Sequence, residues 1–357
     1  MTPMICAMGN PLIDTILSGT GEDLLALGAA AGSMSLVEYE QQQRVVSRCP
    51  VRLRLAGGSA ANTIRAVRWI ARNIDSAAGA RFLSARGLAA TLPAARYVGA
   101  VGQDDDGVSF EALLREETVE PALAITTVPT GSSAIVVTPD SERTMFTFLG
   151  ACRELRAIHL PSFAGVTLFH TTGYMWDTPN QQDAADRATE RARAAGARIS
   201  LDVADSFVVD RYRDALRSWI PGRVDILFAN RQELYSLTGT ESDQAAMAAA
   251  ASLAPMVVMK VGADGCVVGG GGRPGDSSGD ASDISSRGSV LPVSGIQVSA
   301  RDTTGAGDSF AGGFLYGLVS GWDPGACAEL ANRIAASVVT VEGCNYAELS
   351  PELVFGS

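Results

Sequence analysis

The chain has 357 residues, 46% of them hydrophobic and 19% charged, which is the composition of a globular protein rather than of a disordered chain. Its formal net charge of −11 argues against a nucleic-acid partner, because a phosphate backbone requires a basic face. The first residues lack a signal-peptide pattern, apolar runs are too short to span a membrane, and six cysteines without a CxxC pair indicate a reducing compartment. We therefore expect a cytoplasmic protein, monomeric or homodimeric, that binds neither nucleic acid nor membranes.

Short apolar or β-branched runs alternate along the chain with stretches of helical periodicity. The expected strands are 4–8, 96–101, 168–172, 198–203, 225–228, 256–261 and 265–268, and the expected helices include 59–72, 180–195, 231–237 and 244–253. This alternation is typical of βαβ units. The expected fold class is α/β: a doubly wound, mostly parallel sheet with helices on both faces.

Two segments interrupt the alternation. Residues 132–148 predict a strand, a turn and a second strand where a crossover helix would be expected, so we assign them to a small β appendage over the main sheet. The Gly/Ser/Asp-rich tract 269–288 cannot bury enough apolar surface to order itself, and we expect a flexible surface insertion there.

The most informative stretch is the loop 302–310, with the sequence DTTGAGDSF, which leads into an apolar, helix-like run. Gly305, Ala306 and Gly307 precede a helix N-terminus, whose free N–H groups bind anions. Asp308 beside such a loop is explained if it takes a proton from a hydroxyl that attacks the anion; a simple helix cap is the alternative. Neither GxGxxG nor GxxxxGK[ST] fits, which excludes a dinucleotide fingerprint and a P-loop.

This loop resembles the C-terminal signature of the ribokinase-like, or PfkB carbohydrate kinase, family, and GGSAAN at 57–62 resembles its second signature. Further similar motifs are GNPLID at 9–14, VGAVG at 98–102, NRQE at 230–233 and KVGADG at 260–265. The set spans nearly the whole chain in the order of the family. The Asn-Pro pair before the first carboxylate is most similar to the adenosine kinase branch.

The resemblance implies one domain over 1–357 with a β-sheet lid from segments near 12–50 and 120–148. It also implies an ATP-dependent kinase that transfers the γ-phosphoryl group to a primary hydroxyl of an adenosine-like nucleoside. The alternatives are a free-sugar kinase of the ribose, fructose or ketodeoxygluconate type and a non-catalytic ligand-binding protein of the same fold. The presence of Asp308 disfavours the last. In the family pattern Asp308 is the base, and Gly305, Ala306 and Gly307 form the anion hole.

The other implied site residues fall into three groups. The acceptor residues are Asn10, Asp14, Gly57, Gly58, Asn62 and Arg143; the ATP-binding residues are Asn230, Lys260, Gly262, Gly265 and Asn332; the metal residues are Glu233 for Mg²⁺, through water, and Asp302 and Thr304 for a monovalent cation such as K⁺. Lys260 departs from the Thr common at its position.

Plainer roles remain open for several of these residues. Asn62 could bond locally in its helix, Glu233 could be a helix-start carboxylate, and Arg143 could be a solvated strand residue. If the acceptor is a nucleoside, the apolar residues Leu12, Met34 and Leu36 contact its base. The plainer alternative is that they only seal the lid against the large sheet.

Overall fold

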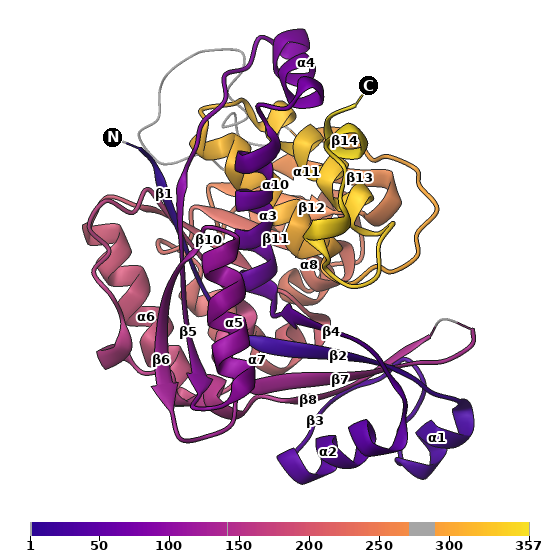
Figure 1. The fold of residues 1–357 in the computed structure, drawn as a ribbon. Coiled ribbons are helices and arrows are strands. Elements are labelled where there is room, and N and C mark those ends of the chain that lie inside the picture. Colours follow the sequence, from indigo (N-terminus) through magenta and orange to yellow (C-terminus); the bar gives the residue numbers. More distant parts are fainter. Residues whose placement is uncertain (1, 141, 271–289, 357) are drawn as a thin grey trace.

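The computed structural model describes residues 2–140, 142–270 and 290–356, and its body is a large sheet between helices (Figure 1). Among these residues the large sheet has nine strands, in the spatial order β14 (Val290–Ser294), β13 (Gly265–Gly269), β12 (Met256–Lys260), β11 (Ile226–Asn230), β10 (Arg198–Asp202), β9 (Leu168–Thr172), β1 (Met4–Met8), β5 (Ala94–Gly102) and β6 (Glu120–Thr126). Neighbouring strands from β12 to β6 are parallel, whereas β13 and β14 are antiparallel additions. The expected fold class is confirmed.

Helices cover both faces of this sheet because its strands bury side chains in both directions. In β1, Ile5 and Ala7 join one core while Cys6 and Met8 join the other, as the two-residue period of a strand requires. The first core contains residues of α3 (Ser59–Asn73), α4 (Ala77–Arg86), α5 (Asp105–Glu116), α10 (Ala306–Val319), α11 (Pro324–Val338) and α12 (Pro351–Phe355). The second contains residues of α6 (Pro179–Ala194), α7 (Ser206–Trp219), α8 (Arg231–Thr238) and α9 (Asp243–Ala250). Short 3₁₀ helices lie at Gly150–Glu154, Ala157–His159, Gly173–Trp176, Gly262–Asp264 and Tyr346–Glu348.

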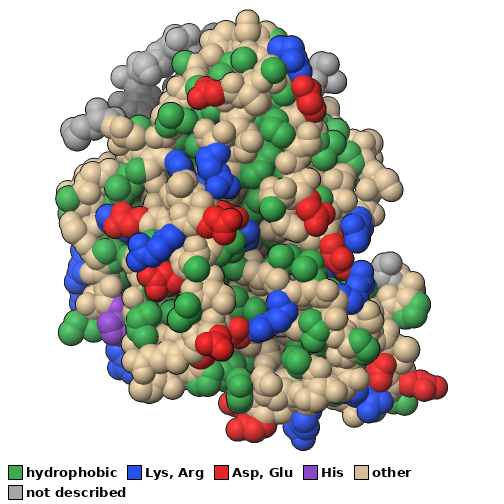
Figure 2. Space-filling model, in the orientation of Figure 1, with side chains coloured by type: hydrophobic (Ala, Val, Ile, Leu, Met, Phe, Trp, Pro, Cys, Tyr) green, Lys and Arg blue, Asp and Glu red, His purple; other side chains and the backbone are tan. Residues whose placement is uncertain are grey.

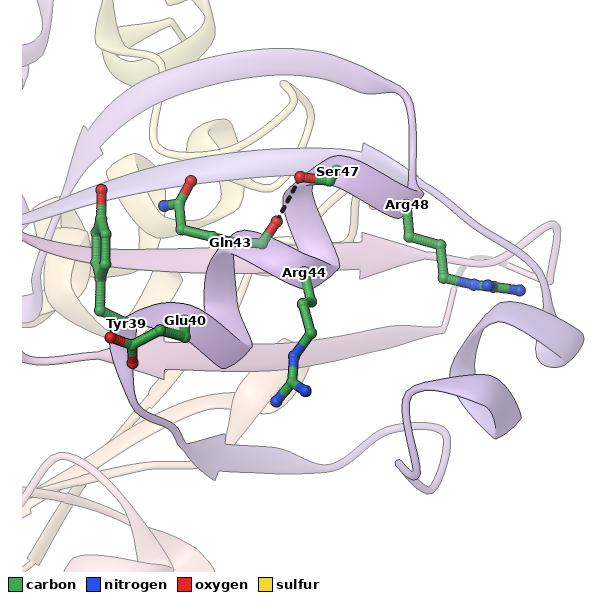
Figure 3. Close-up of a pocket in the computed structure, with 6 residues that line it drawn as sticks. All are labelled: Tyr39, Glu40, Gln43, Arg44, Ser47 and Arg48. Atoms are coloured by element: carbon green, nitrogen blue, oxygen red, sulfur yellow. Dashed lines mark hydrogen bonds between the residues drawn. The ribbon is translucent and has the colours of Figure 1, made fainter.

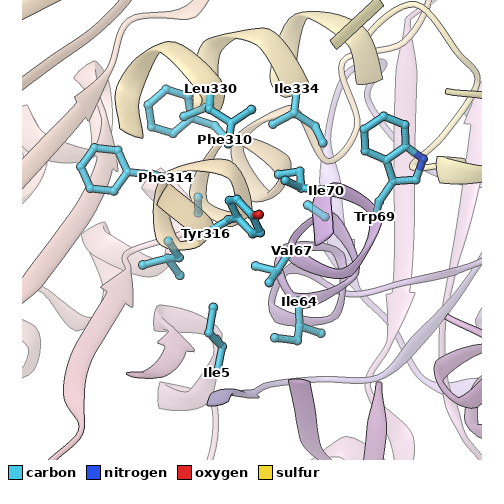
Figure 4. Packing of buried hydrophobic residues seen from close by; sticks show 14 of the residues in the cluster. Ile5, Ile64, Val67, Trp69, Ile70, Phe310, Phe314, Tyr316, Leu330 and Ile334 are labelled. Atoms are coloured by element: carbon cyan, nitrogen blue, oxygen red, sulfur yellow. The ribbon is translucent and has the colours of Figure 1, made fainter. Parts of the chain in front are cut away.

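The close packing of α10 on α3 positions residues of the candidate active site, which is described in the next subsection (Figure 4). A side chain at Gly312 would place its Cβ 2.6 Å from both the Cβ of Ala66 and the carbonyl oxygen of Thr63, so only glycine allows this approach. The N-terminal ends of the two helices meet as a result. Ser59 at the start of α3 thereby comes within hydrogen-bond distance of Asp308 at the start of α10.

A second, smaller sheet extends from one end of the body (Figure 1). Among the described residues its strand order is β3 (Met34–Leu36), β8 (Arg143–Phe148), β7 (Gly131–Val137), β2 (Leu12–Ser18) and β4 (Val51–Gly57). Helices α1 (Gly21–Ala26) and α2 (Tyr39–Arg48) cover its outer face through an apolar cluster that includes Leu24 and Val45. On β8 the alternate residues Arg143, Met145 and Thr147 face the opposite way, into a cavity.

One expected boundary of the lid is wrong. Residues 120–126 form β6, which pairs in parallel with β5 in the large sheet instead of joining the small sheet. The reason is that β6 follows the crossover helix α5, and a strand after such a helix returns to the edge of the same parallel sheet. In this second segment of the lid, the small sheet begins only at Gly131, the first residue of β7. Residues 271–288 of the expected flexible insertion lie outside the described residues.

The visible surface carries acidic and basic side chains interspersed with one another (Figure 2). None of the helices in the described part of the chain combines the length and apolar character that crossing a bilayer requires.

Candidate active site

A cavity of about 660 Å³ lies where the carboxyl ends of the parallel strands meet the small sheet. Ligands of open α/β sheets bind at this edge. Of the residues expected from the sequence, those that line the cavity are Asn10, Asp14, Gly58, Asn62, Arg143, Asn230, Glu233, Lys260, Gly262, Thr304, Gly305, Gly307 and Asp308. Residues from both ends of the chain, more than 290 positions apart in sequence, therefore share one site.

The other expected residues do not line the cavity: Gly57, Gly265, Asp302, Ala306 and Asn332. Asn332 donates from Nδ2 to the carbonyl oxygens of Val293 (3.2 Å) and Ser294 (3.0 Å), so its amide fixes β14. A Cβ at Gly265 would lie 2.1 Å from the oxygen of Val293, which shows that Gly265 allows the same strand to approach.

Asp308 stands in the first turn of α10, held by two donors from α3. The Ser59 hydroxyl donates to its Oδ1 (2.6 Å) and Asn62 Nδ2 donates to its Oδ2 (2.9 Å). Burial raises the pKa of Asp308, although these two hydrogen bonds oppose the shift. A fixed carboxylate with a raised pKa suits the removal of a proton from a hydroxyl.

The loop before α10 has the geometry of an anion hole. Gly305 is the N-cap with a φ of 71°, in the left-handed region that favours glycine. The first intrahelical hydrogen bond runs from Ser309 N to Gly305 O (2.8 Å), so the N–H groups of Gly307 and Asp308 precede it. These free donors and the positive end of the helix dipole favour a bound anion.

Asp14 lies on the cavity face of β2, against the backbone of β4. A Cβ at Gly57 would be 2.1 Å from Asp14 Oδ2, so Gly57 makes room for this carboxylate. Burial raises the pKa of Asp14 to about 7; the positive charge of Arg143 opposes the shift and the negative charge of Asp308 adds to it. Nearby, Asn10 is buried and its Oδ1 accepts from Gln181 Nε2 (2.7 Å).

Lys260, at the end of β12, lies over the anion-binding loop. Its Nζ donates to Asp202 Oδ2 (2.6 Å) and would be 3.2 Å from a Cβ on Gly307. Burial works against the charged amine, but Asp202 and Glu233 outweigh it and the pKa of Lys260 is raised. The amine therefore stays protonated beside the place where an anion would bind.

Asn230 and Glu233 form a capping box at the start of α8. Asn230 Oδ1 accepts from Glu233 N (2.9 Å), and the Glu233 carboxylate accepts from Asn230 N (2.7 Å) and Nδ2 (2.6 Å). Burial raises the pKa of Glu233 to about 7, with the charge of Lys260 opposing. The N-x-x-E pattern thus has a structural role in this chain in addition to its place in the cavity wall.

Arg143 joins the small sheet to the loop before α10. Its Nη1 donates to both Asp302 Oδ1 and Thr304 Oγ1, so the guanidinium occupies the two residues expected to bind a monovalent cation. Its Nε is buried and has no acceptor among the described residues. That N–H is available to an oxygen atom of a bound substrate.

Sequence reasoning missed several residues that hold the predicted ones in place, among them Asp202 and Ser59. Asp202, the partner of Lys260, ends the strand that was expected at 198–203, and its position at the carboxyl edge of a parallel sheet was an available signal. Ser59 lies inside the second signature, but its bond to Asp308 depends on how α3 and α10 cross.

A second, shallow hollow lies on the outer side of α2 and shares no residue with the cavity (Figure 3). The polar side chains of Gln43, Arg44 and Ser47 border it, and Ser47 Oγ donates to the carbonyl oxygen of Gln43 (2.8 Å). None of the residues expected for the chemistry lies there.

Comparison with known proteins shows the family of this chain. The model of the pfkB family of carbohydrate kinases matches residues 22–351. The chain belongs to this family. As a pfkB-family protein it is an ATP-dependent phosphotransferase, and its similarities place it on the adenosine kinase branch.

Three relatives illustrate the similarity of this pfkB-family chain. An adenosine kinase of Schizophyllum commune is 26% identical over 354 residues, covering 92% of each chain. The crystal structure of adenosine kinase from Sinorhizobium meliloti is 29% identical with a TM-score of 0.80, and the match covers 97% of this chain and 96% of that one. A probable sugar kinase protein from Rhizobium etli CFN 42 is 30% identical with a TM-score of 0.81 at the same coverage.

Proposed function

We propose that this kinase transfers the γ-phosphoryl group of ATP, with Mg²⁺, to a primary hydroxyl of an adenosine-like nucleoside. The observation that carries the proposal is the joint presence of Asp308, the anion-binding N-terminus of α10 and Asp14 in one cavity. Phosphoryl transfer is catalysed mainly by positioning of the reactants and by electrostatic stabilisation. Each of these three groups contributes either positioning or electrostatic stabilisation.

Each of the following residues of the cavity has its own role in the proposed reaction. Asp14 accepts hydrogen bonds from hydroxyl groups of the acceptor and orients it, with Asn10 and Asn62 beside it. Asp308 takes the proton of the primary hydroxyl as its oxygen attacks the γ-phosphorus. The N–H groups at the start of α10 bind the oxygens of the transferred phosphoryl group, and Lys260 and Arg143 offset their charge.

The acidic residues of the cavity fit a magnesium ion that is carried mainly by the nucleotide. Within the described ranges no group of three or more His, Cys, Asp or Glu side chains is arranged to hold a metal ion. Each carboxylate oxygen of Glu233 and Asp202 already accepts one hydrogen bond, and each keeps a second lone pair for water-mediated contact. Mg²⁺ keeps several waters and binds through one or two carboxylates plus substrate phosphates, where it would neutralise phosphate charge.

The wall of the cavity that the small sheet forms favours a nucleoside over a free sugar. Leu12 of β2, Met34 and Leu36 of β3 and Met145 of β8 give the small sheet an apolar face toward the cavity. A free sugar, polar all round, would leave this face without a partner, whereas a nucleobase would cover it. Because one similar protein carries a sugar-kinase description, a free-sugar acceptor is the second candidate.

An acceptor panel tests the proposal. Purified protein with ATP and Mg²⁺ is offered adenosine, other nucleosides, ribose, fructose and ketodeoxygluconate, and ADP release is measured. We expect the highest kcat/KM with a purine nucleoside. A higher kcat/KM with a free sugar would favour the second candidate. If none of the acceptors gave rise to ADP, both candidates would be overturned.

The cytoplasm supplies ATP and Mg²⁺ and suits the cysteines. All six, each a described residue, are buried and free. We therefore propose that the kinase acts in the cytoplasm.

A further inference from the structure

The guanidinium of Arg143 lies where the family resemblance would put a monovalent cation. One nitrogen of Arg143, Nη1, is shared between Asp302 Oδ1 and Thr304 Oγ1. Asp302 and Thr304 are the two residues that the resemblance assigns to K⁺. A positive charge contributed by the lid strand β8 therefore already occupies this place.

Other oxygen atoms around Asp302 are engaged as well. Asp302 Oδ1 accepts from Thr304 N (2.9 Å) and Oδ2 accepts from Gly343 N (2.6 Å), and the side chain is only 4% exposed. The carbonyl oxygen of Val339 accepts from the N–H groups of Arg301 (2.7 Å) and Asp302 (3.1 Å). A hard cation needs a shell of oxygen ligands, and here these oxygens point at N–H donors instead.

Electrostatics lead to the same result. The negative charge of Asp302 is matched by a guanidinium that stays protonated at any physiological pH. A second cation at Asp302 would meet the repulsion of Arg143 in a partly desolvated place, where like charges interact strongly. The residues present therefore do not fit K⁺, and the expectation that Asp302 and Thr304 bind it is replaced.

We infer that Arg143 serves as a built-in cation beside the catalytic loop, so that this chain neither binds nor needs a monovalent cation. The same contact ties the lid strand β8 to the loop that precedes α10. The inference rests on the proposed phosphoryl transfer for its statement about activity, but its statement about ion binding stands without it.

Ion binding is tested without substrate. The melting temperature is measured in KCl and in choline chloride at equal ionic strength, for the wild type and for Arg143→Gln. We expect no K⁺-specific shift in the wild type and a K⁺-specific rise in the variant, because Asp302 then lacks its cation and a bound ion stabilises the folded state. A K⁺-specific rise in the wild type would overturn the inference, and so would an Arg143→Gln protein that is indifferent to K⁺.

The matched control is Arg54→Gln. Arg54 lies on the lid strand β4 and its Nη2 pairs with Asp106 Oδ1 at 2.8 Å, so this variant removes the same charge from the lid at another place. We expect its melting temperature to show no K⁺-specific shift. A shift equal to that of Arg143→Gln would assign the effect to lid charge in general and contradict the inference.

Activity supplies the second arm. With the best acceptor, ADP release by the wild type should be the same within about two-fold in KCl, NaCl and choline chloride at fixed ionic strength, since screening is then held constant. Several-fold activation by K⁺ over choline would overturn the inference. If no acceptor yields ADP, the proposed function fails while the melting temperatures still decide the ion question.

Discussion

In the proposed reaction Asp308 removes the proton of the attacking hydroxyl, and its two donors hold it in place for this step. Asp308→Asn keeps the shape of the side chain but cannot accept a proton. We expect kcat to fall by roughly 10²–10⁴-fold, the range for a general base, while ATP affinity changes little. Steady-state kinetics together with ATP titration check this. A variant that keeps more than a tenth of the turnover would remove Asp308 from the chemical step.

Asp14 gives acceptor binding a pH dependence of known sign. Its pKa of about 7 means that it is largely protonated at pH 6 and ionised at pH 8. The ionised carboxylate accepts stronger, charge-assisted hydrogen bonds from hydroxyls than the protonated form does, so the KM for the acceptor should fall several-fold as pH rises through 7. Asp14→Asn should flatten this profile, and Glu233→Gln should keep it. A profile that is unchanged in Asp14→Asn would exclude Asp14 from acceptor binding.

The raised pKa of Asp14 also makes the free energy of unfolding depend on pH. A carboxyl whose pKa is higher in the fold than in the unfolded chain binds a proton on folding, so its contribution is present below pH 4 and is lost as pH rises through 7. The free energy of unfolding of the ligand-free wild type should therefore fall, relative to Asp14→Asn, between pH 5 and pH 8. Urea unfolding at several pH values measures the difference. A difference that does not change with pH would contradict the raised pKa.

The pair of Lys260 and Asp202 is nearly buried, with side chains 14% and 2% exposed. Lys260→Met leaves the Asp202 carboxylate buried without its partner, which should lower the free energy of unfolding by about 3 kcal/mol. Removing both charges, in Lys260→Met with Asp202→Asn, should restore much of that loss. Denaturant unfolding checks both variants. If the double variant were less stable than the single one, Asp202 would have another partner of equal weight.

At the residue scale the sequence motifs predicted the reactive groups better than they predicted the contacts that hold those groups in place. Asp308, Asp14 and Asn62 line the cavity as expected, because each lies inside a motif whose spacing fixes its place at a strand or helix end. The partner of Asn332 is the backbone of β14, which no spacing in α11 could predict. The contact of Arg143 with Asp302 joins positions 159 residues apart, so it follows only from the way the lid packs.

At the scale of elements the loop before α10 depends on Gly305. An alanine there would have to hold a φ of 71°, and its Cβ would lie 2.4 Å from Cys344 Sγ. The left-handed conformation alone costs an alanine about 1 kcal/mol. We expect Gly305→Ala to raise the KM for ATP and to destabilise the protein beyond that cost, as measured by kinetics and thermal unfolding.

A control for Gly305→Ala is Gly321→Ala. Gly321 has a φ of 77°, and no heavy atom lies within 4 Å of the position that its Cβ would take, so the variant reports the conformational cost without a clash. Combining Gly305→Ala with Cys344→Ala should recover part of the lost stability. Equal losses for the two glycine variants would mean that Cys344 does not constrain the loop.

The order of strands and helices was predictable because each buried parallel strand is a short apolar run between turn residues. The expected strand at 168–172 coincides with β9, and the expected strand at 4–8 coincides with β1. The sheet to which β6 belongs was not predictable, because the sequence of residues 120–126, EPALAIT, has no pattern that distinguishes a strand of the large sheet from a strand of the lid. Only the pairing of β6 with β5 assigns it to the large sheet.

At the scale of the whole molecule the site exists only where two sheets meet. The large sheet supplies Lys260 and Asn230, the small sheet supplies Asp14 and Arg143, and the packing of α10 on α3 aligns Asp308 between them. The proposed catalysis therefore requires both sheets to be folded and packed together. The net charge of −11 does not exclude an anionic substrate, because the N-terminus of α10 and the cations Lys260 and Arg143 line the cavity beside its acidic residues.

The most direct test compares adenosine with 5′-deoxyadenosine in the presence of ATP and Mg²⁺, following ADP and the phosphorylated nucleoside together. The two acceptors differ only in the hydroxyl that Asp308 is proposed to activate. We predict equal amounts of ADP and AMP from adenosine, and neither product above background from 5′-deoxyadenosine. With Asp308→Asn both products should form from adenosine at a rate that is lower by roughly 10²–10⁴-fold. ADP formation that is the same with both acceptors, or adenosine that is bound but never phosphorylated, would contradict the proposal.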